Sequence, residues 1–303
     1  MLFRSLSFPA RTAGDGALKS LIVTADDFGR AREVNQAVET AHRLGILTAA
    51  SLMVSAPATA DAVNRAQRLP SLRVGLHLVL VDGSAVLQPQ NLPDLVDAQG
   101  CFRINMVKTA IDIFLRPAVR RQVAAEIAAQ FEAFERTGLR LDHVNAHKHF
   151  HLHPTLAAQI FEIGRRCGMR AIRVPFEPAH VLARVEPNTS RRWTMLAAPW
   201  TALLKAQARR HGVVVPDNVF GLAWSGAMVE ARMVGLLRHL PDGITEIYAH
   251  PATSGVFEGA ASDYRYADEL AALTAPAVLA AARASGARLG GFADFAPAVP
   301  ENS

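Results

Sequence analysis

Side chains suited to metal and proton chemistry are concentrated at three points of the sequence. Two adjacent carboxylates, Asp26 and Asp27, follow the apolar run LIVTA, and a single histidine, His77, lies within the apolar run VGLHLVL. Five of the 11 histidines lie in HVNAHKHFHLHP, which starts at His143 and includes His147. Because imidazole and carboxylate groups are the usual ligands of catalytic divalent ions, these residues could build a hydrolytic metal site.

Each of these features also has a simpler explanation. A run of alternating histidines can be a solvent-exposed, adventitious metal binder. A lone histidine in an apolar strand, such as His77, can be a hydrogen-bonded core residue, and Asp27 can cap a following helix. The joint occurrence at several strand ends favours a folded site, because burying an imidazole without a partner costs about 1–3 kcal/mol and a shared metal would satisfy it.

The adjacent carboxylates need separate roles, because successive residues of a strand point to opposite faces. At the end of a strand the backbone can turn, so that both Asp26 and Asp27 face the same site. One could then ligate the metal while the other accepts a proton from the attacking water, whose pKa the metal lowers towards neutrality. The residues alone do not decide which carboxylate has which role.

Strand and helix patterns alternate along the chain, which indicates a parallel α/β fold. Strands are predicted at 21–26, 47–54, 74–80, 141–147, 171–175, 244–250 and 289–292. Helical patterns cover 32–44, 57–68, 118–137 and 155–167, with a long loop at 83–103, a helix from Asn105 that Pro117 should break, and a poorly periodic segment at 176–215. Six or seven strands in one domain predict a distorted or incomplete (β/α) barrel.

In such a barrel the reacting groups lie at the C-terminal ends of the strands. The predicted strands carry polar residues at or near those ends: Asp26 and Asp27, His77, His143 and His147, Arg173, and His250. This placement supports a single site formed by residues that are far apart in the sequence.

The amino-acid composition limits which binding partners and which cellular compartment can be expected for this protein. The net charge of +5 permits contact with nucleic acid or an anionic membrane, but the basic residues are scattered and only 7% of residues are aromatic, so nucleic-acid binding is not expected. No apolar run reaches the roughly 18–20 residues of a membrane-spanning helix. The two cysteines, Cys101 and Cys167, are expected to pack as small hydrophobes in a reducing compartment. We therefore expect a cytoplasmic protein, with peripheral contact at the inner membrane surface left open.

A single domain is expected over residues 20–295, with a partly disordered lead-in over 1–19 and a C-terminal tail over 296–303. The N-terminal stretch lacks the apolar core and cleavage site of a secretory signal. The segment WTMLAAPWTALLKA, residues 193–206, carries two tryptophans and several leucines. It could line a lipid-binding surface or form a core helix, and the sequence does not decide between them.

Four motifs together resemble the YdjC-like carbohydrate deacetylases in order and spacing: TADDFG at 24–29, GLHL at 75–78, HVNAHKHFHLHP at 143–154 and AHPA at 249–252. The resemblance runs from about residue 20 to residue 295. It implies a NodB-like, distorted (β/α) barrel that hydrolyses N-acetyl groups of amino sugars with a divalent ion, magnesium or zinc.

The same resemblance implies roles for individual residues. The metal ligands would be Asp27, His77 and His147, and Asp26 would be the general base, by analogy with related polysaccharide deacetylases. His250 would be a candidate general acid that protonates the departing amine, and Arg173 would lie near the substrate.

Within the family, the stretch at 24–54 and EIYAHPA at 246–252 resemble most the subgroup associated with hopanoid biosynthesis. This implies an N-acetylglucosaminyl group on a hopanoid lipid as the substrate, with a chitooligosaccharide or another N-acetyl sugar as the alternative. More distant alternatives are a non-haem iron oxygenase, whose ligands are also two histidines and a carboxylate, and a basic peripheral membrane- or nucleic-acid-binding protein.

Overall fold

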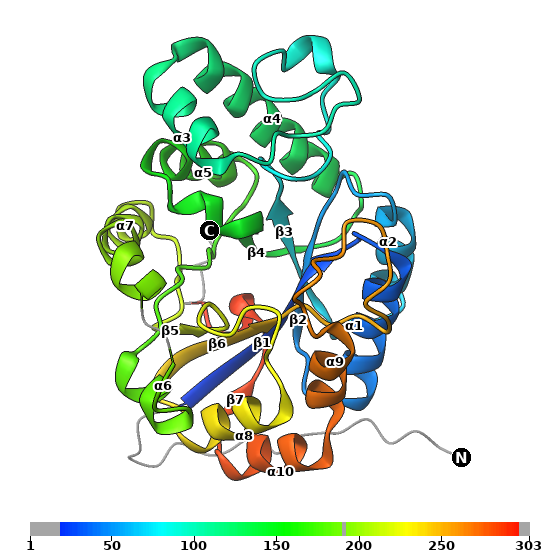
Figure 1. The fold of residues 1–303 in the computed structure, drawn as a ribbon, viewed down its shortest axis with the longest axis vertical. Helices are drawn as coiled ribbons and strands as arrows, with labels where there is room; N and C mark the ends of the chain where they lie inside the picture. The colour runs from blue at the N-terminus through cyan, green and yellow to red at the C-terminus, as the bar shows by residue number, and fades with distance from the viewer. Residues whose placement is uncertain (1–18, 190–191, 297–303) are drawn as a thin grey trace, which may run out of the picture.

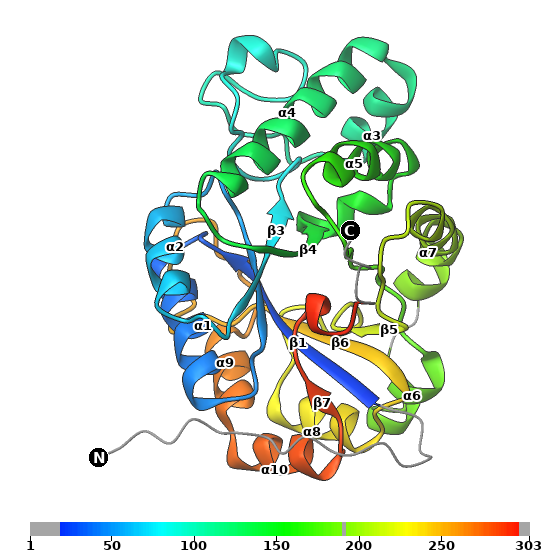
Figure 2. The same ribbon diagram turned by 180° about the vertical axis from the view of Figure 1, so that it is seen from behind.

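Strands and helices alternate through most of the chain in a computed structural model that describes residues 19–189 and 192–296 (Figures 1 and 2). The strands are β1 (Lys19–Phe28), β2 (Ala49–Leu52), β3 (Arg73–Leu78), β4 (Leu141–Ala146), β5 (Asn218–Phe220), β6 (Gly243–Ala249) and β7 (Arg288–Leu289). The α-helices are α1 (Arg32–Leu44), α2 (Thr59–Gln67), α3 (Met106–Leu115), α4 (Pro117–Glu135), α5 (Pro154–Arg166), α6 (Ala179–Val185), α7 (Arg192–Arg210), α8 (Glu230–Arg238), α9 (Tyr266–Thr274) and α10 (Pro276–Ala284). Short 3₁₀ turns are η1 (Pro89–Asn91), η2 (His147–Leu152) and η3 (Phe292–Asp294).

The strands form one parallel sheet in the order β4-β3-β2-β1-β6-β5, with β7 paired to β1. Beyond β4 the sheet continues through isolated bridges, from Val144 to Ile172 and from Ala171 to Val214. Since Val214 lies just before β5, these bridges curl the sheet back towards its other edge. The arrangement confirms the predicted distorted (β/α) barrel, in which one arc is held by single bridges instead of continuous strands.

Local sequence explains where the helices begin and end. Helix α1 buries Val34, Val38 and Ala41, which share one face at helical spacing, and it ends at Gly45 as the sequence predicts. The side chain of Asn105 accepts the backbone N–H of Lys108 and so caps α3. Pro117 ends this helix and occupies the first turn of α4, because proline has no N–H to donate but suits the start of a helix.

The barrel interior changes from apolar to polar along β1. Leu21, Val23 and Ala25 belong to the large core between the sheet and its helices. Ile22 instead belongs to a small cluster with Phe292, and Thr24 further along donates a hydrogen bond to Glu246. Because alternate residues of a strand share a face, Ile22, Thr24 and Asp26 line the interior in that order. The carboxyl end of the barrel is therefore the polar end.

The opposite end of the barrel is covered by the C-terminal segment that includes β7 and η3. Asp142, near the start of β4, accepts the backbone N–H groups of Phe292 at 3.1 Å and Ala293 at 2.9 Å. Arg73, at the start of β3, donates two hydrogen bonds to Asp294 at 2.9 and 2.7 Å. These contacts hold the C-terminal segment 288–294, which we call the plug, against the amino ends of the strands. Residues at this end of a barrel contribute to stability.

Three sequence predictions need correction. Residues 171–175 do not form a continuous strand, because Pro175 has no N–H and the segment pairs only through isolated bridges. Residues 289–292 are not a strand, since β7 ends at Leu289 and the chain turns into η3. The segment 176–215 holds α6 and the 19-residue helix α7, whose periodicity is obscured by Pro199 inside it and by apolar residues on its exposed face.

Other expectations concern the ends, the cysteines and membrane spans. Residues 1–18 and 297–303, which make up most of the predicted lead-in and tail, lie outside the described residues. Cys101 and Cys167 are both exposed, so the expectation that they pack as small hydrophobes is wrong. Among the described helices, none combines the length and hydropathy needed to cross a bilayer.

Replacing Asp142 with alanine should weaken the plug. Asp142→Ala leaves the N–H groups of Phe292 and Ala293 without their acceptor, so we expect the free energy of unfolding to fall by about 2–3 kcal/mol in urea denaturation. Asp142→Asn keeps one acceptor oxygen and should lose less. An Asp142→Ala variant as stable as the unchanged protein would contradict this role.

The same contact has a pH dependence. Burial alone would raise the pKa of Asp142, but His143 and the N–H groups of Phe292 and Ala293 lower it below its usual range. The stabilisation is therefore fully present above about pH 4, the ordinary pKa of an aspartate, and is lost as the pH falls through the lowered folded-state pKa. The Asp142→Ala variant should lack this part of the acid-induced loss of stability.

Candidate metal centre

A turn at Asp27 brings two consecutive carboxylates to one site. Asp27 has a φ of 62°, in the left-handed region that non-glycine residues rarely adopt. The pairing of β1 with β2 shifts register between Ala25 and Phe28 at the same place. The alternation of side chains is broken there, so Asp27 joins Asp26 at the carboxyl end of the barrel. The expectation that the backbone turns at the end of this strand is met.

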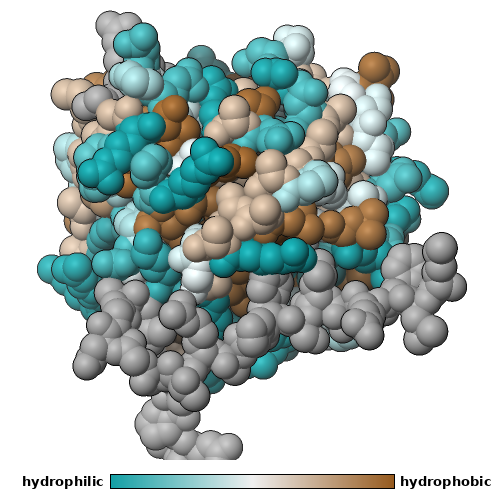
Figure 3. Space-filling model, turned by 90° about the horizontal axis from the view of Figure 1, so that it is seen from below, coloured by the Kyte–Doolittle hydropathy of each residue, from teal (hydrophilic) through white to brown (hydrophobic). Residues whose placement is uncertain are grey.

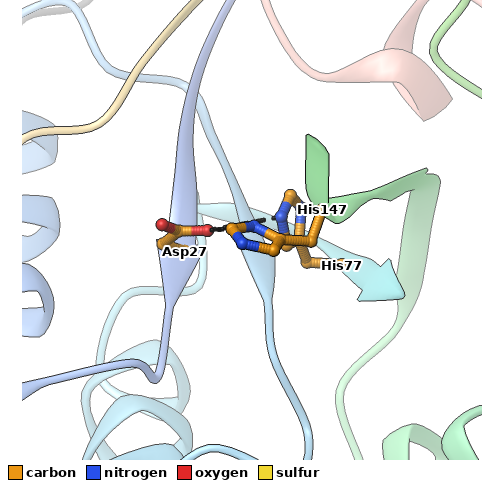
Figure 4. Close-up of side chains that lie close together, drawn as sticks. All are labelled: Asp27, His77 and His147. Atoms are coloured by element: carbon orange, nitrogen blue, oxygen red, sulfur yellow. Dashed lines mark ion pairs between the residues drawn. The ribbon is translucent and has the colours of Figure 1, made fainter. Parts of the chain in front are cut away.

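Three buried side chains meet beside this turn. Asp27 from β1, His77 from β3 and His147 directly after β4 point towards one another (Figure 4). Oδ1 of Asp27 lies 3.3 Å from Nε2 of His77 and 3.3 Å from Nδ1 of His147. Ligand atoms about 2.1 Å from a tetrahedral ion lie roughly 3.4 Å apart, so the spacing suits a common metal.

The hydrogen bonding around the cluster tests whether a metal fits. Oδ1 of Asp27 and Nε2 of His77 are buried and have no hydrogen-bond partner, whereas Oδ2 of Asp27 accepts a hydrogen bond from Arg30 at 2.9 Å. A buried polar atom without a partner costs about 1–3 kcal/mol, and a cation bound to both atoms would satisfy them. Burial would raise the pKa of Asp27, but His147, His77 and Arg30 hold it well below the usual range. The donor set therefore fits a divalent ion.

Asn145 fixes the tautomer of His77. The carboxylate of Asp26 can only accept hydrogen bonds, so the Asn145 amide nitrogen faces it at 3.1 Å. The Asn145 oxygen then faces Nδ1 of His77 at 2.7 Å, and the ring proton must be on Nδ1. This leaves the lone pair of His77 Nε2 directed at Asp27. Such partners commonly orient histidine ligands.

Asp26 is held by a buried arginine. Arg173 donates to both oxygens of Asp26 and, from its other edge, to Glu246, and none of its side chain is exposed. Burial would raise the pKa of Asp26, but Arg173, with His77 and His250, lowers it below the usual range, so Asp26 stays ionised. Arg173 lies behind Asp26, with its guanidinium shared between the carboxylates of Asp26 and Glu246, and its predicted place near the substrate stays a prediction.

The histidine-rich run is folded rather than a solvent-exposed tract. His143 lies between Asp142 and Ser51, at 2.9 Å from each. Lys148 and His149 both adopt φ of 54°, and this left-handed turn separates His147 from His149. Nε2 of His149 lies 2.8 Å from the Tyr248 hydroxyl. The run therefore supplies His147 to the cluster with Asp27 and His77, and its other histidines take separate positions.

His250 lies just after β6, near the same end of the barrel. Its ring lies 5.0 Å from the ring of Tyr264 and 5.8 Å from that of Tyr248, and its Nδ1 has no hydrogen-bond partner. Its backbone N–H donates to Glu269. An imidazole with a free nitrogen is chemically able to transfer a proton, as a general acid requires.

A cleft of about 980 Å³ adjoins the cluster through Arg30, which contacts Asp27. Its other lining residues include Asp82, Ser84, Phe102 and Arg103. Several polar groups on mainly apolar walls are typical of a small-molecule site.

Sequence reasoning missed the residues that support the site. Asn145, Glu246 and Arg30 contact His77, Arg173 and Asp27, and Ser51 contacts Asn145, but none of the four belongs to a motif of metal chemistry. The available signal was position alone, because Asn145 lies two residues before His147 in β4 and Arg30 three residues after Asp27.

Comparisons with known proteins agree with this fold and motif pattern. A "Carbohydrate deacetylase" of Geobacillus stearothermophilus is 28% identical over 277 residues, covering 90% of this chain and 97% of that relative. One from Brevibacillus brevis is 39% identical over 143 residues, and this match covers 47% of this chain and about half, 54%, of the relative.

Two solved structures share the fold. A candidate cellobiose-phosphate cleavage protein of Enterococcus faecalis has a TM-score of 0.72 at 24% identity, covering 92% of this chain and 100% of that one. The lactam utilization protein of Thermus thermophilus has a TM-score of 0.50 at 16% identity, covering 90% and 100%. The sequence model of the YdjC-like proteins matches residues 20–284, a range that contains Asp27, His77 and His147, and the chain belongs to this family.

Proposed function

We propose that this protein hydrolyses the N-acetyl group of an amino sugar in a metal-dependent reaction that releases acetate. The observation that carries the proposal is the buried cluster of Asp27, His77 and His147, with donor atoms that lack hydrogen-bond partners, beside the ionised Asp26. Relatives that are carbohydrate deacetylases, one of them matched over nearly its full length, support a hydrolase of amide bonds in N-acetyl sugars.

Amide hydrolysis forms a bond between a water oxygen and the acetyl carbon and breaks the bond from that carbon to nitrogen. One proton must leave the water and one must reach the amine. We assign the first transfer to Asp26, which Arg173 keeps ionised and oriented, and the second to His250. A bound divalent ion would polarise the acetyl oxygen and lower the pKa of the attacking water.

The donor set bears on the choice between zinc and magnesium. His77 and His147 offer imidazole nitrogens, which suit zinc, whereas magnesium prefers oxygen ligands. We therefore propose zinc as the better match to these ligands, with magnesium as the alternative. A non-haem iron oxygenase would use the same ligand types but has no need for the ion pair between Asp26 and Arg173.

For the substrate we propose a lipid-linked N-acetylglucosaminyl group of the hopanoid type, with a chitooligosaccharide as the alternative. Its support is the resemblance of the stretch at 24–54 and of EIYAHPA to the hopanoid-associated subgroup. We propose a cytoplasmic location, at the inner membrane surface when a lipid-linked substrate is used. The exposed, unpaired thiols of Cys101 and Cys167 suit a reducing compartment.

Removal of the metal should abolish activity. After dialysis against a strong chelator we expect no acetate release from an N-acetylated sugar, and added zinc or magnesium should restore it, because the water depends on the ion for its acidity. His77→Ala and His147→Ala should lower metal content and acetate release together, since each removes one of three protein ligands.

His239→Ala is a matched control, because this histidine is exposed at the end of α8. It should keep both metal and activity. Full activity after exhaustive chelation would rule out the metal mechanism, and normal metal content in His77→Ala or His147→Ala would remove that residue from the ligand set.

Asp26→Asn should separate catalysis from metal binding. The amide cannot accept the proton of the water, so we expect kcat to fall roughly 100-fold or more while metal content stays normal. Asp27→Asn is the paired variant and should lose metal as well as activity. If instead Asp26→Asn loses the metal and Asp27→Asn keeps it, the two aspartates have the opposite roles.

The lipid-linked substrate should be preferred over free sugars. Each buried methylene of a lipid contributes about 0.8 kcal/mol to binding, which a soluble sugar cannot gain. We expect kcat/KM for a lipid-linked N-acetylglucosaminyl substrate to exceed that for N-acetylglucosamine and chitobiose, measured as acetate release. Equal kcat/KM values would leave general sugar deacetylation as the function and contradict the lipid specificity.

A further inference from the structure

Two helices on the same side of the molecule expose apolar side chains to solvent. In both views α3 and α7 lie on the same side of the molecule, with α5 between them (Figures 1 and 2). The exposed apolar residues are Val107, Ile111, Phe114 and Leu115 of α3 and Met195, Leu196, Trp200 and Leu203 of α7, which we call the α3–α7 surface. The side chain of Trp193, from the segment singled out in the sequence, lies outside the described residues.

The spacing of these residues makes one apolar stripe on each helix. Val107, Ile111 and Phe114 follow an i, i+4, i+7 pattern, and Leu196, Trp200 and Leu203 follow the same pattern. The other side of α7 packs inward through Thr201, Leu204 and Ala208. Helix α7 therefore has a core face, as one sequence alternative for 193–206 predicts, and an exposed apolar face, for which lipid binding stays a prediction.

A groove joins the two stripes. Ile111, Phe114, Leu115 and Trp200 line a groove of about 560 Å³, together with residues 152–154 at the start of α5. Phe114 is 61% exposed and Trp200 49%, although both are large apolar side chains. Contiguous exposed apolar residues of this kind mark a binding surface for a protein or a membrane.

Charge favours a membrane over a second copy of this chain. The described part of α7 from Met195 onward has no carboxylate, and its basic residues Arg209 and Arg210 are exposed, whereas Lys205 packs over the Phe176 ring. On α3, Asp112 is already paired with Lys108 at 3.2 Å and lies 3.8 Å from Arg116. A two-fold contact through α7 would bring the Arg209 and Arg210 cations of two copies into one interface with no carboxylate of this helix to pair with them, whereas anionic lipid head groups would neutralise them.

The chemistry of the surface also fits the interfacial zone of a bilayer. An amphipathic helix with tryptophan and leucine on one face and basic residues beside them binds in the plane of an anionic membrane. The face seen from below, where α8 and α10 lie, instead mixes hydrophilic and hydrophobic side chains (Figure 3). We propose that the α3–α7 surface docks this protein on the interface of an anionic lipid bilayer, a property that goes beyond the proposed deacetylation and needs no turnover.

Vesicle co-sedimentation tests the proposal with the full chain. We expect binding to phosphatidylcholine vesicles that contain phosphatidylglycerol, weak binding to pure phosphatidylcholine, and loss of binding as salt rises. Leu196→Glu and Phe114→Glu should each lower the partition coefficient roughly fivefold or more, because each places a carboxylate at the lipid contact. Leu44→Glu is the matched control, since Leu44 is 55% exposed and Leu196 67%, and Leu44 lies at the end of α1.

Three measurements separate the outcomes. All three variants should keep acetate release from a soluble N-acetylated chitooligosaccharide, which shows that they fold and tests deacetylation independently of vesicle binding. Absence of binding to anionic vesicles, or equal loss of binding in Leu44→Glu, would overturn the proposal. Sedimentation of the unchanged protein as a dimer that Leu196→Glu dissociates would overturn it too, because the surface would then be a contact between two copies.

Discussion

Two like charges at adjacent positions of one strand are the constraint on which the site depends. Asp26 and Asp27 can both be ionised at the same end of the barrel only if each carboxylate has its own cationic partner and the two side chains point in different directions. The left-handed turn at Asp27 changes the direction of its side chain relative to that of Asp26. Arg173 then neutralises Asp26, and Arg30 engages Oδ2 of Asp27, so that only Oδ1 remains for the cluster with the histidines.

The polar groups behind these carboxylates form a continuous path through the barrel. Asp142 contacts His143, His143 contacts Ser51, and Ser51 accepts from Asn145, which in turn contacts both Asp26 and His77. The plug that seals the amino ends of the strands is thus connected by hydrogen bonds to the groups at the carboxyl ends. A buried polar network of this kind holds its members in one arrangement when each of them is satisfied. His77 is therefore linked through hydrogen bonds to Asp142 and to the C-terminal segment that Asp142 binds.

Sequence reasoning located the fold and the cluster because both rest on local signals. Apolar runs ending in carboxylates or histidines identify the strands and their carboxyl ends, and the barrel then brings Asp27, His77 and His147 together. The pairing of Arg173 with Asp26 joins residues 147 positions apart, and no local pattern encodes it. The turn at Asp27 was expected from the two adjacent carboxylates, but the sequence did not show that Asp27 itself would adopt a positive φ. Helix α7 was missed because its exposed face is apolar, which removes the contrast that reveals a helix.

Without a bound ligand, the cluster lowers the stability of the folded chain. Oδ1 of Asp27 and Nε2 of His77 are buried without hydrogen-bond partners, and each such atom costs about 1–3 kcal/mol. Ordinary folding would place apolar side chains at these positions or supply partners for them. Surrounding groups instead hold the donors in place: Asn145 orients His77, and Arg30 orients Asp27. A cation that binds these atoms in the folded chain would remove this unfavourable free energy. Its binding would therefore also stabilise the folded state against unfolding.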